Sequence, residues 1–317
     1  MTNSFSSENN KKIFFPKNPL NGSIPEELLE EIPCPLCGSF QKTKVYPKYY
    51  PRLVRCLSCG LIYTNPRLNK ENLGQLYTKE YFQNDNSSIF GYQNYLADEN
   101  KIRKTFARRL KTIEKIKKVG FLLDIGCAMG FFMDEAEKRG WKTKGIEISE
   151  FAATFAEKNL GLDVMRGNIQ EVNLPQNSFD LVILWDVIEH LDNPLVCLKK
   201  IHLALKKDGL LVFSTPNISS IPAKLTRHRW VGYKLSDEHL TYFSPETISL
   251  LCQKTGFKVV KSHSLGKYVS LALFAARLSL YSKIAGKIFK FIDYFLPKKF
   301  NLYLSAFDII CVYAQKI

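Results

Sequence analysis

The sequence predicts an α/β protein with a parallel sheet, preceded by a small metal-binding ribbon. Strand-like and helix-like segments alternate from Phe121 onward, and the first strand, Leu122–Ile125, ends in a glycine-containing turn. Two Cys-x-x-Cys pairs precede this region. Alternation of strands and helices places parallel strands in one sheet with helices on both faces. A chain of 317 residues can hold such a domain together with additions.

Composition limits the class of protein and its partners. The chain is 45% hydrophobic and 24% charged, as in globular soluble proteins, and its net charge of +15 favours anionic partners such as nucleic acid, acidic lipid or phosphorylated substrates. The start, 1–12, lacks the apolar core of a signal peptide, and no uncharged apolar run is long enough to span a membrane. Eight cysteines without a secretory signal favour thiols and metal ligands over disulfides. We therefore expect a cytoplasmic protein.

The N-terminal part divides into a flexible tail, 1–31, and a zinc ribbon, 32–66. Two Cys-x-x-Cys-Gly segments stand 18 residues apart, a spacing that unrelated cysteines would rarely produce. Four thiolates in a tetrahedron suit zinc, and four protein ligands would close the site, which indicates a structural metal. A ribbon this small would depend on that metal to fold. The predicted ligands are Cys34, Cys37, Cys56 and Cys59.

A helical linker, 67–118, should join the ribbon to the main domain. Apolar residues at spacings of three and four predict a helix over 98–118 with one buried face. That face comprises Ile102, Phe106, Leu110, Ile113 and Ile116. The basic residues Arg103, Lys104, Arg108, Arg109, Lys111, Lys115, Lys117 and Lys118 are expected to cover the rest. A solvated face is favoured over a nucleic-acid surface.

The main domain is expected over 119–317. Strands are predicted at 121–125, 142–146, 163–166, 179–184, 210–215, 257–263 and 307–314. Helices are predicted at 130–139, 150–159, 192–206 and 245–255. Ligands of such sheets bind at the carboxyl ends of the strands, near the switch in strand order. The segment Gly126–Gly130 lies at such an end.

The turn after the first strand carries small residues where a nucleotide could approach the backbone. Gly126, Ala128 and Gly130 precede a helix whose free N–H groups face that approach, although an ordinary turn would look similar. Glu147 ends the second strand and can accept both hydroxyls of a ribose. A dinucleotide fingerprint needs glycine at 128 and glycine or alanine at 131, where this chain has Ala128 and Phe131. The pattern therefore favours S-adenosylmethionine.

Several further motifs occur in the order typical of one family. The chain resembles the class I S-adenosylmethionine-dependent methyltransferases over about 119–265 and 307–315, which implies a Rossmann-like seven-stranded sheet. The motifs are 122–130, 145–148, 167–168, 178–191, 205–209, 215–217 and 238–244. At position 128 this chain has alanine, where glycine is commoner in the family, but alanine is also small.

The resemblance implies a role for each matching residue. Asp124, Gly126, Ala128 and Gly130 would hold the methionine moiety and Glu147 the ribose, and Ile148 would lie against the adenine. Asn168 would bond the exocyclic amine of the adenine, although it could simply cap a turn. Trp185 and Asp186 would border the transferring methyl group.

Four polar residues are candidates for the chemistry. Asp186, Glu189 and His190 stand at i, i+3 and i+4 of an expected helical turn and would share a face. His190 could act as a general base, since the ordinary pKa of histidine lies near neutrality. With His239 the set also resembles the divalent-metal site of small-RNA 2′-O-methyltransferases and quinone-biosynthesis O-methyltransferases, which have glutamate in place of Asp186. An ordinary hydrogen-bond network is the third alternative.

Two insertions bear on the substrate. The first, 218–240, is expected to form a lid, and its basic and aromatic residues suit a phosphate-bearing or interfacial substrate, though a solvated loop is the alternative. These residues are Lys224, Arg227, His228, Arg229, Trp230, Tyr233 and Lys234. The second, 266–301, is expected to form amphipathic helices with an apolar stripe opposite lysines over 277–296. That helix would lie on an anionic membrane surface, or else pack on the body or on a second subunit.

The sequence thus predicts a methyltransferase acting on a small-molecule, sugar or lipid-linked acceptor, at oxygen. Fused ribbons of this kind resemble those in bacterial methyltransferases of sugar and cell-envelope pathways. An RNA methyltransferase is one alternative, less favoured because the basic residues are spread along the chain. A non-catalytic protein that binds S-adenosylmethionine or membrane is another. Neither the acceptor nor the oligomeric state follows from the sequence.

Overall fold

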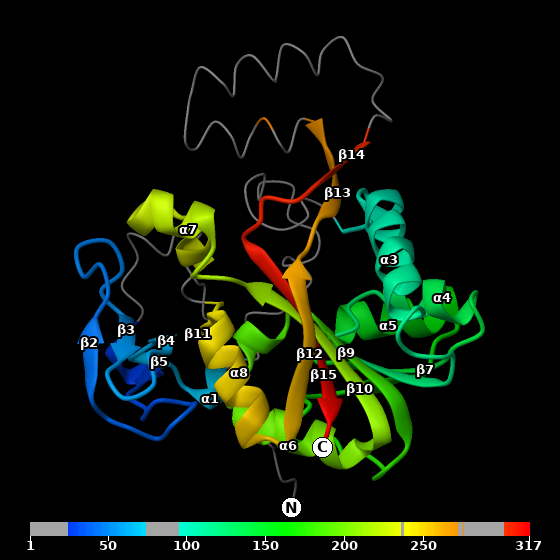
Figure 1. The fold of residues 1–317 in the computed structure, drawn as a ribbon, viewed down its shortest axis with the longest axis horizontal. Coiled ribbons are helices and arrows are strands. Elements are labelled where there is room, and N and C mark those ends of the chain that lie inside the picture. Colours follow the sequence, from blue (N-terminus) through cyan, green and yellow to red (C-terminus); the bar gives the residue numbers. More distant parts are fainter. Residues whose placement is uncertain (1–24, 74–94, 236–237, 272–274, 276–300) are drawn as a thin grey trace, which may run out of the picture.

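A seven-stranded sheet forms the centre of the molecule (Figure 1). The structure is a computed structural model that describes residues 25–73, 95–235, 238–271, 275 and 301–317. The strand order is β12-β15-β10-β9-β6-β7-β8. The strands are β6 (Phe121–Ile125), β7 (Lys142–Glu147), β8 (Val164–Arg166), β9 (Phe179–Trp185), β10 (Leu205–Pro216), β12 (Phe257–Ser264) and β15 (Ile309–Lys316). The predicted α/β class and the seven-stranded sheet are confirmed.

The sheet is parallel except for its last strand. β6 pairs in parallel with β7 and β9, and β10 pairs in parallel with β9. β15 lies between β10 and β12 and is antiparallel to both. The order reverses between β6 and β9, because the chain extends the sheet first from β6 towards β8 and then from β9 towards the other edge. The carboxyl ends of β6, β7 and β9 therefore meet at the position where sheets of this kind bind ligands.

Helices cover both faces of the sheet, and alternate strand residues face each layer. On one face lie α3 (Glu99–Ile113), α4 (Phe131–Glu137) and α5 (Glu150–Leu160), and on the other lie α6 (Pro194–Ala204) and α8 (Pro245–Lys254). The predicted helix at 192–206 begins two residues later, because Asn193 accepts a hydrogen bond from Val196 N and Pro194 occupies the first turn. It also ends earlier, because β10 begins at Leu205.

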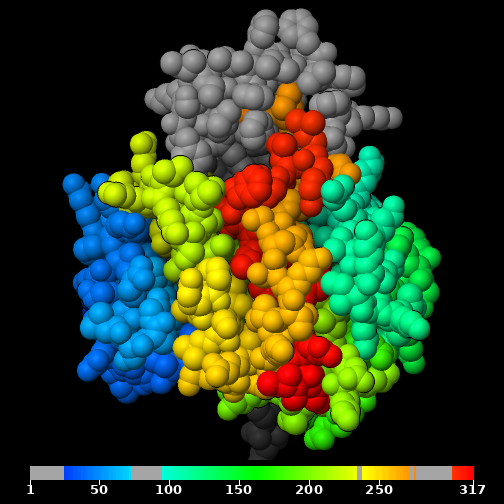
Figure 2. Space-filling model, in the orientation of Figure 1, coloured from blue at the N-terminus to red at the C-terminus, as the bar shows by residue number. Residues whose placement is uncertain are grey.

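A four-stranded sheet forms the ribbon and extends into the main domain. Its order is β11-β4-β3-β2, with β2 (Lys42–Lys44), β3 (Leu53–Cys56) and β4 (Ile62–Thr64) from the ribbon and β11 (Thr241–Tyr242) directly after the first insertion. Leu61 and Tyr63 are buried in the same apolar cluster as Leu184 and Phe213 of the main sheet. The ribbon therefore packs as part of the body, as the blue surface beside α7 (Ile221–Thr226) and α8 shows (Figure 2).

Two segments differ from the predicted domain boundaries. Leu29–Glu30 forms β1, which pairs with β5 (Arg67–Leu68), so this end of the expected flexible tail is fixed to the ribbon. A short 3-10 helix, η1 (Glu26–Leu28), precedes it, and α1 (Lys70–Leu73) follows β5. The second insertion begins with β13 (Lys267–Ser270), paired with β14 (Asn301–Leu304), and not with a helix. Tyr268 and Val269 are residues that favour strands.

The predicted amphipathic stripe at 277–296 lies outside the described residues, as does the tail before Pro25. Among the helices that the structure describes, none is long and apolar enough to cross a membrane.

The start of α4 offers a test of the packing at the glycine turn. Gly130 has φ +80°, and a Cβ there would clash with Leu162 and lie 3.0 Å from the Ala156 Cβ. Gly161 ends α5 at φ +69°, with nothing within 4 Å of an added Cβ. Gly161→Ala should cost about 1 kcal/mol of unfolding free energy through backbone strain alone. Gly130→Ala should cost roughly 2–4 kcal/mol, because overpacking adds to that strain. Chemical denaturation of both variants measures the difference, and equal losses would contradict the account.

Candidate active site

The loop after β6 approaches its neighbours too closely to carry larger side chains. Gly126 has φ +70°, and a Cβ there would lie 2.6 Å from Val187 Cγ2. Gly126 N and Cys127 N both donate to Ile146 O, at 2.8 and 3.1 Å, which holds the loop against β7. Ala128 has φ +50°, a left-handed conformation that glycine adopts more easily, which explains why glycine is the commoner residue there.

Glu147 joins this loop to the loop after β7. Its Oε2 accepts from Ala128 N and its Oε1 from Ser149 N, both at 2.8 Å. The side chain is buried, and burial raises the pKa of its carboxyl although the backbone N–H groups oppose this. Each oxygen of a carboxylate has two acceptor positions, so Glu147 can hold the loops and still accept ribose hydroxyls. Its predicted role in cofactor binding fits this geometry.

The other predicted cofactor residues lie along the same edge. Asp124 is buried in β6, where burial, followed by the charge of Glu147, raises the pKa of its carboxyl well above the usual range. Ile148 is 41% exposed directly after β7, where an apolar ring could lie on it. Asn168 Oδ1 accepts from Gln170 N at 3.0 Å, which is the turn-capping role given above as the alternative. Their roles towards the cofactor stay predictions.

Asp186 does not share a face with Glu189 and His190, contrary to the prediction. The chain leaves β9 with Asp186 at φ +55°, and the following 3-10 helix η3 (Ile188–His190) begins only two residues later. Asp186 Oδ1 accepts from Ser214 Oγ at 2.6 Å. The expected i, i+3, i+4 face does not form because Asp186 lies before the helical turn. The four-residue metal site is therefore reduced to three candidate ligands.

Glu189, His190 and His239 do come together. One ligand atom from each lies within 4.8 Å of the others, and the two imidazole rings are 4.8 Å apart at a steep angle. His190 Nδ1 lies 2.9 Å from Glu238 O, which fixes the orientation of the ring. Glu189 Oε2 and His239 Nδ1 are buried and form no hydrogen bond of normal geometry, although Thr215 and the Gly232 backbone act on these two side chains as weak partners. Buried polar atoms without a good hydrogen bond are rare, so these two atoms indicate a position for a ligand.

Burial changes the ionisation of this cluster. It lowers the pKa of His190 to about 4 and that of His239 well below its ordinary value. Burial, followed by the charge of Asp186, raises the pKa of Glu189 well above its usual range. Burial therefore makes His190 a weaker base than an ordinary histidine, and its catalytic role stays a prediction. Two neutral imidazoles beside a carboxyl group are a donor set that divalent metals accept.

The ribbon fixes one wall of this cluster. Thr64 N donates to Leu240 O and Thr64 Oγ1 to His239 O, both at 3.0 Å, and Leu240 N donates to Glu189 O at 2.8 Å. Arg67 Nη1 also donates to Asp192 O at 2.7 Å. The sequence contained no signal for these contacts, because each contact between the ribbon and the main domain joins residues more than a hundred positions apart. The ribbon thus positions the backbone of both candidate catalytic segments.

The four ribbon cysteines form the predicted cluster. Their Sγ atoms lie within 4.8 Å of one another, with Cys34 to Cys59 at 3.5 Å and Cys37 to Cys56 at 3.4 Å. A tetrahedral zinc with Zn–S bonds of 2.3 Å would separate the sulfurs by about 3.8 Å. The donor set and spacing therefore fit zinc, and a fully protein-ligated ion would be structural.

The first insertion does not present its aromatic residues to a substrate. Trp230 and Tyr233 are buried with Tyr50, Ile62 and Tyr242 in an apolar cluster between the insertion and the ribbon. The 3-10 helices η4 (Arg227–Arg229) and η5 (Val231–Leu235) carry this packing. These two rings therefore face the ribbon and not a substrate. The expected lid role of 218–240 stays a prediction.

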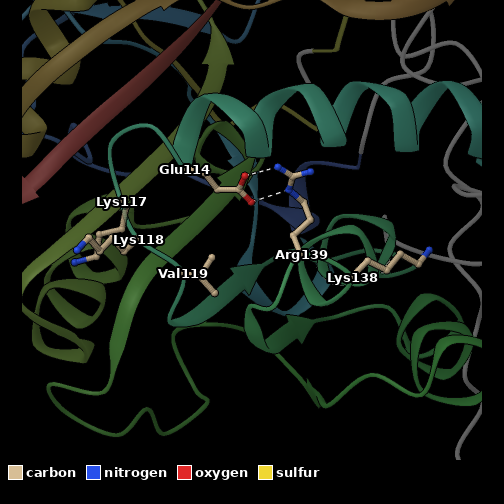
Figure 3. Close-up of a pocket in the computed structure, with 6 residues that line it drawn as sticks. All are labelled: Glu114, Lys117, Lys118, Val119, Lys138 and Arg139. Atoms are coloured by element: carbon tan, nitrogen blue, oxygen red, sulfur yellow. Dashed lines mark hydrogen bonds and ion pairs between the residues drawn. The ribbon is translucent and has the colours of Figure 1, made fainter.

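A surface depression lies at the opposite edge of the sheet (Figure 3). Its lining comes from the segments before β6 and between α4 and β7, where the strands begin. Arg139 Nε donates to Glu114 Oε1 at 2.7 Å across it, and Lys117, Lys118 and Lys138 make the rest of the lining basic. It is separate from the ligand edge defined by Gly126, Glu147 and Glu189.

Comparisons with known proteins identify the family to which this α/β domain belongs. A family model described as a methyltransferase domain matches residues 95–262, more than half of the chain. The chain therefore belongs to this methyltransferase-domain family, and its sheet and motifs place it among class I S-adenosylmethionine-dependent methyltransferases.

Curated relatives match a shorter region. The ubiquinone biosynthesis O-methyltransferase of Bradyrhizobium diazoefficiens is 33% identical over 101 residues, 30% of this chain and 40% of that protein. The mitochondrial enzyme of the same name from Schizosaccharomyces pombe is 28% identical over 113 residues, 33% of this chain and 41% of that protein. A probable S-adenosylmethionine-dependent methyltransferase of Mycolicibacterium smegmatis is 26% identical over 140 residues, 44% of this chain and 52% of that protein. The chain thus spans about half of these relatives or less.

A match to a solved structure covers more of the chain. A crystal structure of a SAM-dependent methyltransferase from Archaeoglobus fulgidus is 22% identical, with a TM-score of 0.49, and the match covers 70% of this chain and 99% of that chain.

Metal content tests the ribbon. We expect one zinc per chain, and Cys37→Ser should lose it and lower the unfolding temperature, because the metal supplies folding energy to the ribbon. Cys252→Ala, a buried cysteine outside the cluster, is the control and should keep one zinc. Elemental analysis and thermal unfolding provide the measurements. A zinc-free wild type, or full zinc retention in Cys37→Ser, would count against the predicted site.

Proposed function

We propose that this chain is an S-adenosylmethionine-dependent O-methyltransferase that acts on a small molecule. Membership of the methyltransferase family supports the reaction. The O-methyltransferase names of the curated relatives support oxygen as the accepting atom and a small molecule as the acceptor. The observation that carries the proposal is the common edge of the sheet, where the loop held by Glu147 lies beside the cluster of Glu189, His190 and His239.

The residues at this edge would have separate roles in binding the cofactor and in methyl transfer. S-adenosylmethionine supplies a methyl group activated by its sulfonium charge. The Gly126–Gly130 loop would accommodate the methionine moiety and Glu147 the ribose hydroxyls. Methyl transfer is an in-line displacement, so the enzyme mainly aligns the acceptor oxygen with the methyl carbon and excludes water. Trp185, at the end of β9, would form one wall of that space.

The buried cluster would prepare the acceptor hydroxyl. Glu189, His190 and His239 would hold a divalent cation, whose charge would orient the acceptor oxygen and favour its deprotonated form. The weakly paired Glu189 Oε2 and His239 Nδ1 support this role over that of a closed hydrogen-bond network. A metal-free enzyme is the second candidate, in which one of the neutral imidazoles accepts the proton directly.

The structure of the ribbon favours a small acceptor over RNA. The ribbon residues Leu36, Leu61 and Tyr63 are buried against the main domain. One edge of β4 also pairs with β11 of the main domain. A ribbon packed in this way supports the main domain structurally and is less suited to binding nucleic acid. The narrower expectation of a sugar or lipid-linked acceptor, with a peripheral membrane contact through 266–301, rests on the fused ribbon and the basic charge of that insertion.

Calorimetric titration of the zinc-loaded chain with S-adenosylmethionine tests the proposal. We expect saturable binding to the wild type and binding at least tenfold weaker to Glu147→Ala. The substitution removes the hydrogen bonds to the ribose and those that hold the loop at Ala128. Glu150→Ala, three residues along with an 87% exposed carboxylate, is the matched control and should bind normally. Circular dichroism checks that each variant is folded. A folded, zinc-loaded wild type that gives no binding heat would refute the proposal.

A further inference from the structure

The segment between α3 and β6 exposes apolar side chains among lysines. The sequence predicted Ile116 on the buried face of the helix, but α3 ends at Ile113, and Ile116 is 44% exposed beyond that end. Val119, three residues further along, is 48% exposed. The positions on either side of Ile116 and the position before Val119 are occupied by Lys115, Lys117 and Lys118. This basic loop, 115–119, therefore combines cationic and apolar side chains at the surface.

Carboxylates do not neutralise the charge of the basic loop. Within the part of the chain that the structure describes, none of its three lysines forms an ion pair. Lys117 Nζ donates to Asp208 O at 2.8 Å, which is a backbone carbonyl without net charge. The adjacent acid, Glu114, accepts from Arg139 Nε at 2.7 Å, and this hydrogen bond lowers the pKa of its carboxyl. Arg139 therefore compensates the charge of Glu114, and the loop keeps its positive charge.

The basic loop forms one wall of the depression at this edge of the sheet, which has a volume of about 560 Å³ (Figure 3). On the other wall, Lys138 pairs with Asp134 at 2.8 Å, yet its side chain is 58% exposed. Lys142, at the start of β7, has its Nζ 5.0 Å from the centre of the Phe121 ring. Cations thus lie on both sides of the exposed Val119, around a hollow large enough for a phosphate headgroup.

The apolar side chains decide which anionic partner fits this surface. Single exposed apolar residues are common on proteins, but here two of them stand among lysines in one short loop. Nucleic acid would neutralise the lysines through its phosphates and would leave Ile116 and Val119 in water. A bilayer with anionic lipid accepts both kinds of side chain, because its headgroups attract lysine and its interface takes up apolar residues. The composition of the loop therefore favours a lipid surface over a polynucleotide.

We propose that the basic loop and the depression beside it dock the protein on an anionic lipid bilayer. β6 begins at Phe121, directly after the loop, and its carboxyl end carries the Gly126 turn. The bilayer would therefore lie at the amino-terminal edge of the sheet, and the candidate active site at the opposite edge would face the aqueous phase. β12 runs parallel to β10, and β13 of the second insertion follows its carboxyl end, at that opposite edge. The basic loop is thus a membrane contact different from the one expected at 266–301, and it does not depend on the function proposed above.

Vesicle flotation with the full-length, zinc-loaded chain tests this docking. We expect the wild type to bind vesicles of phosphatidylglycerol and phosphatidylcholine mixed in equal amounts, and not vesicles of phosphatidylcholine alone. The double variant Lys118→Gln/Val119→Ser should raise the Kd for the mixed vesicles at least tenfold, because it removes one charge and one apolar side chain from the interface. Lys254→Gln/Val260→Ser is the matched control and should agree with the wild type within about twofold, since Lys254 is exposed and Val260 is 47% exposed elsewhere on the surface. Surface substitutions of this kind should leave every variant folded.

Three results would overturn the proposal. The first is a wild type that does not bind the mixed vesicles, or a control that loses as much binding as the loop variant. The second is normal binding by the loop variant together with lost binding in Lys283→Gln/Lys287→Gln/Lys290→Gln, which would assign the membrane contact to 266–301. The third is binding to duplex DNA that weakens in Lys118→Gln and not in Val119→Ser, while vesicle binding is unchanged in both. S-adenosylhomocysteine should bind the loop variant as it binds the wild type, and a weaker Kd would contradict the separation of the two edges.

Discussion

The buried carboxylate of Glu147 is the constraint on which the ligand edge of this protein depends. It accepts from Ala128 N after β6 and from Ser149 N after β7, so that one side chain sets the separation of the two loops. A buried carboxylate is costly unless it is hydrogen-bonded, and these two donors make its burial tolerable. Each oxygen of a carboxylate has a second acceptor position in addition to the one that these donors use. The group that holds the two loops together is thus also the group proposed to bind the ribose.

The ribbon holds in place the backbone that carries the polar cluster of Glu189, His190 and His239. Its strand β4 continues through β11, and Thr64 bonds the backbone at His239 while Leu240 bonds the backbone at Glu189. A displacement of the ribbon would therefore move two of the three residues of the polar cluster. This arrangement gives the four-cysteine motif a physical reason to be fused to a methyltransferase domain, because it stabilises a wall that the sheet alone does not hold.

The sequence predicted those features that local pattern and motif spacing determine. The strand at 121–125, the glycine turn, the acidic end of the next strand and the four cysteines all follow from such patterns, and the structure contains each of them. The orientation of Asp186 was not predicted, because a positive φ after β9 turns this residue towards Ser214. Residue spacing does not encode such a local conformation.

Burial and long-range contacts account for the other differences. Arg109 was assigned to the solvated face because charged residues usually lie there, and only the packing of α3 over Trp185 buries it. Similarly, Trp230 and Tyr233 have the composition of a substrate-facing lid, but they fill the space beside the ribbon. Contacts between segments so distant in the chain cannot be read from periodicity.

A crystal structure of the zinc-loaded chain with S-adenosylhomocysteine tests most directly the central claim that cofactor and chemistry share one edge of the sheet. The account predicts the ribose hydroxyls on Glu147, the methionine moiety over the Gly126–Gly130 loop, and the sulfur directed towards Trp185 and the Glu189 cluster. A ligand bound at any other position, such as the depression between Glu114 and Arg139, would contradict it.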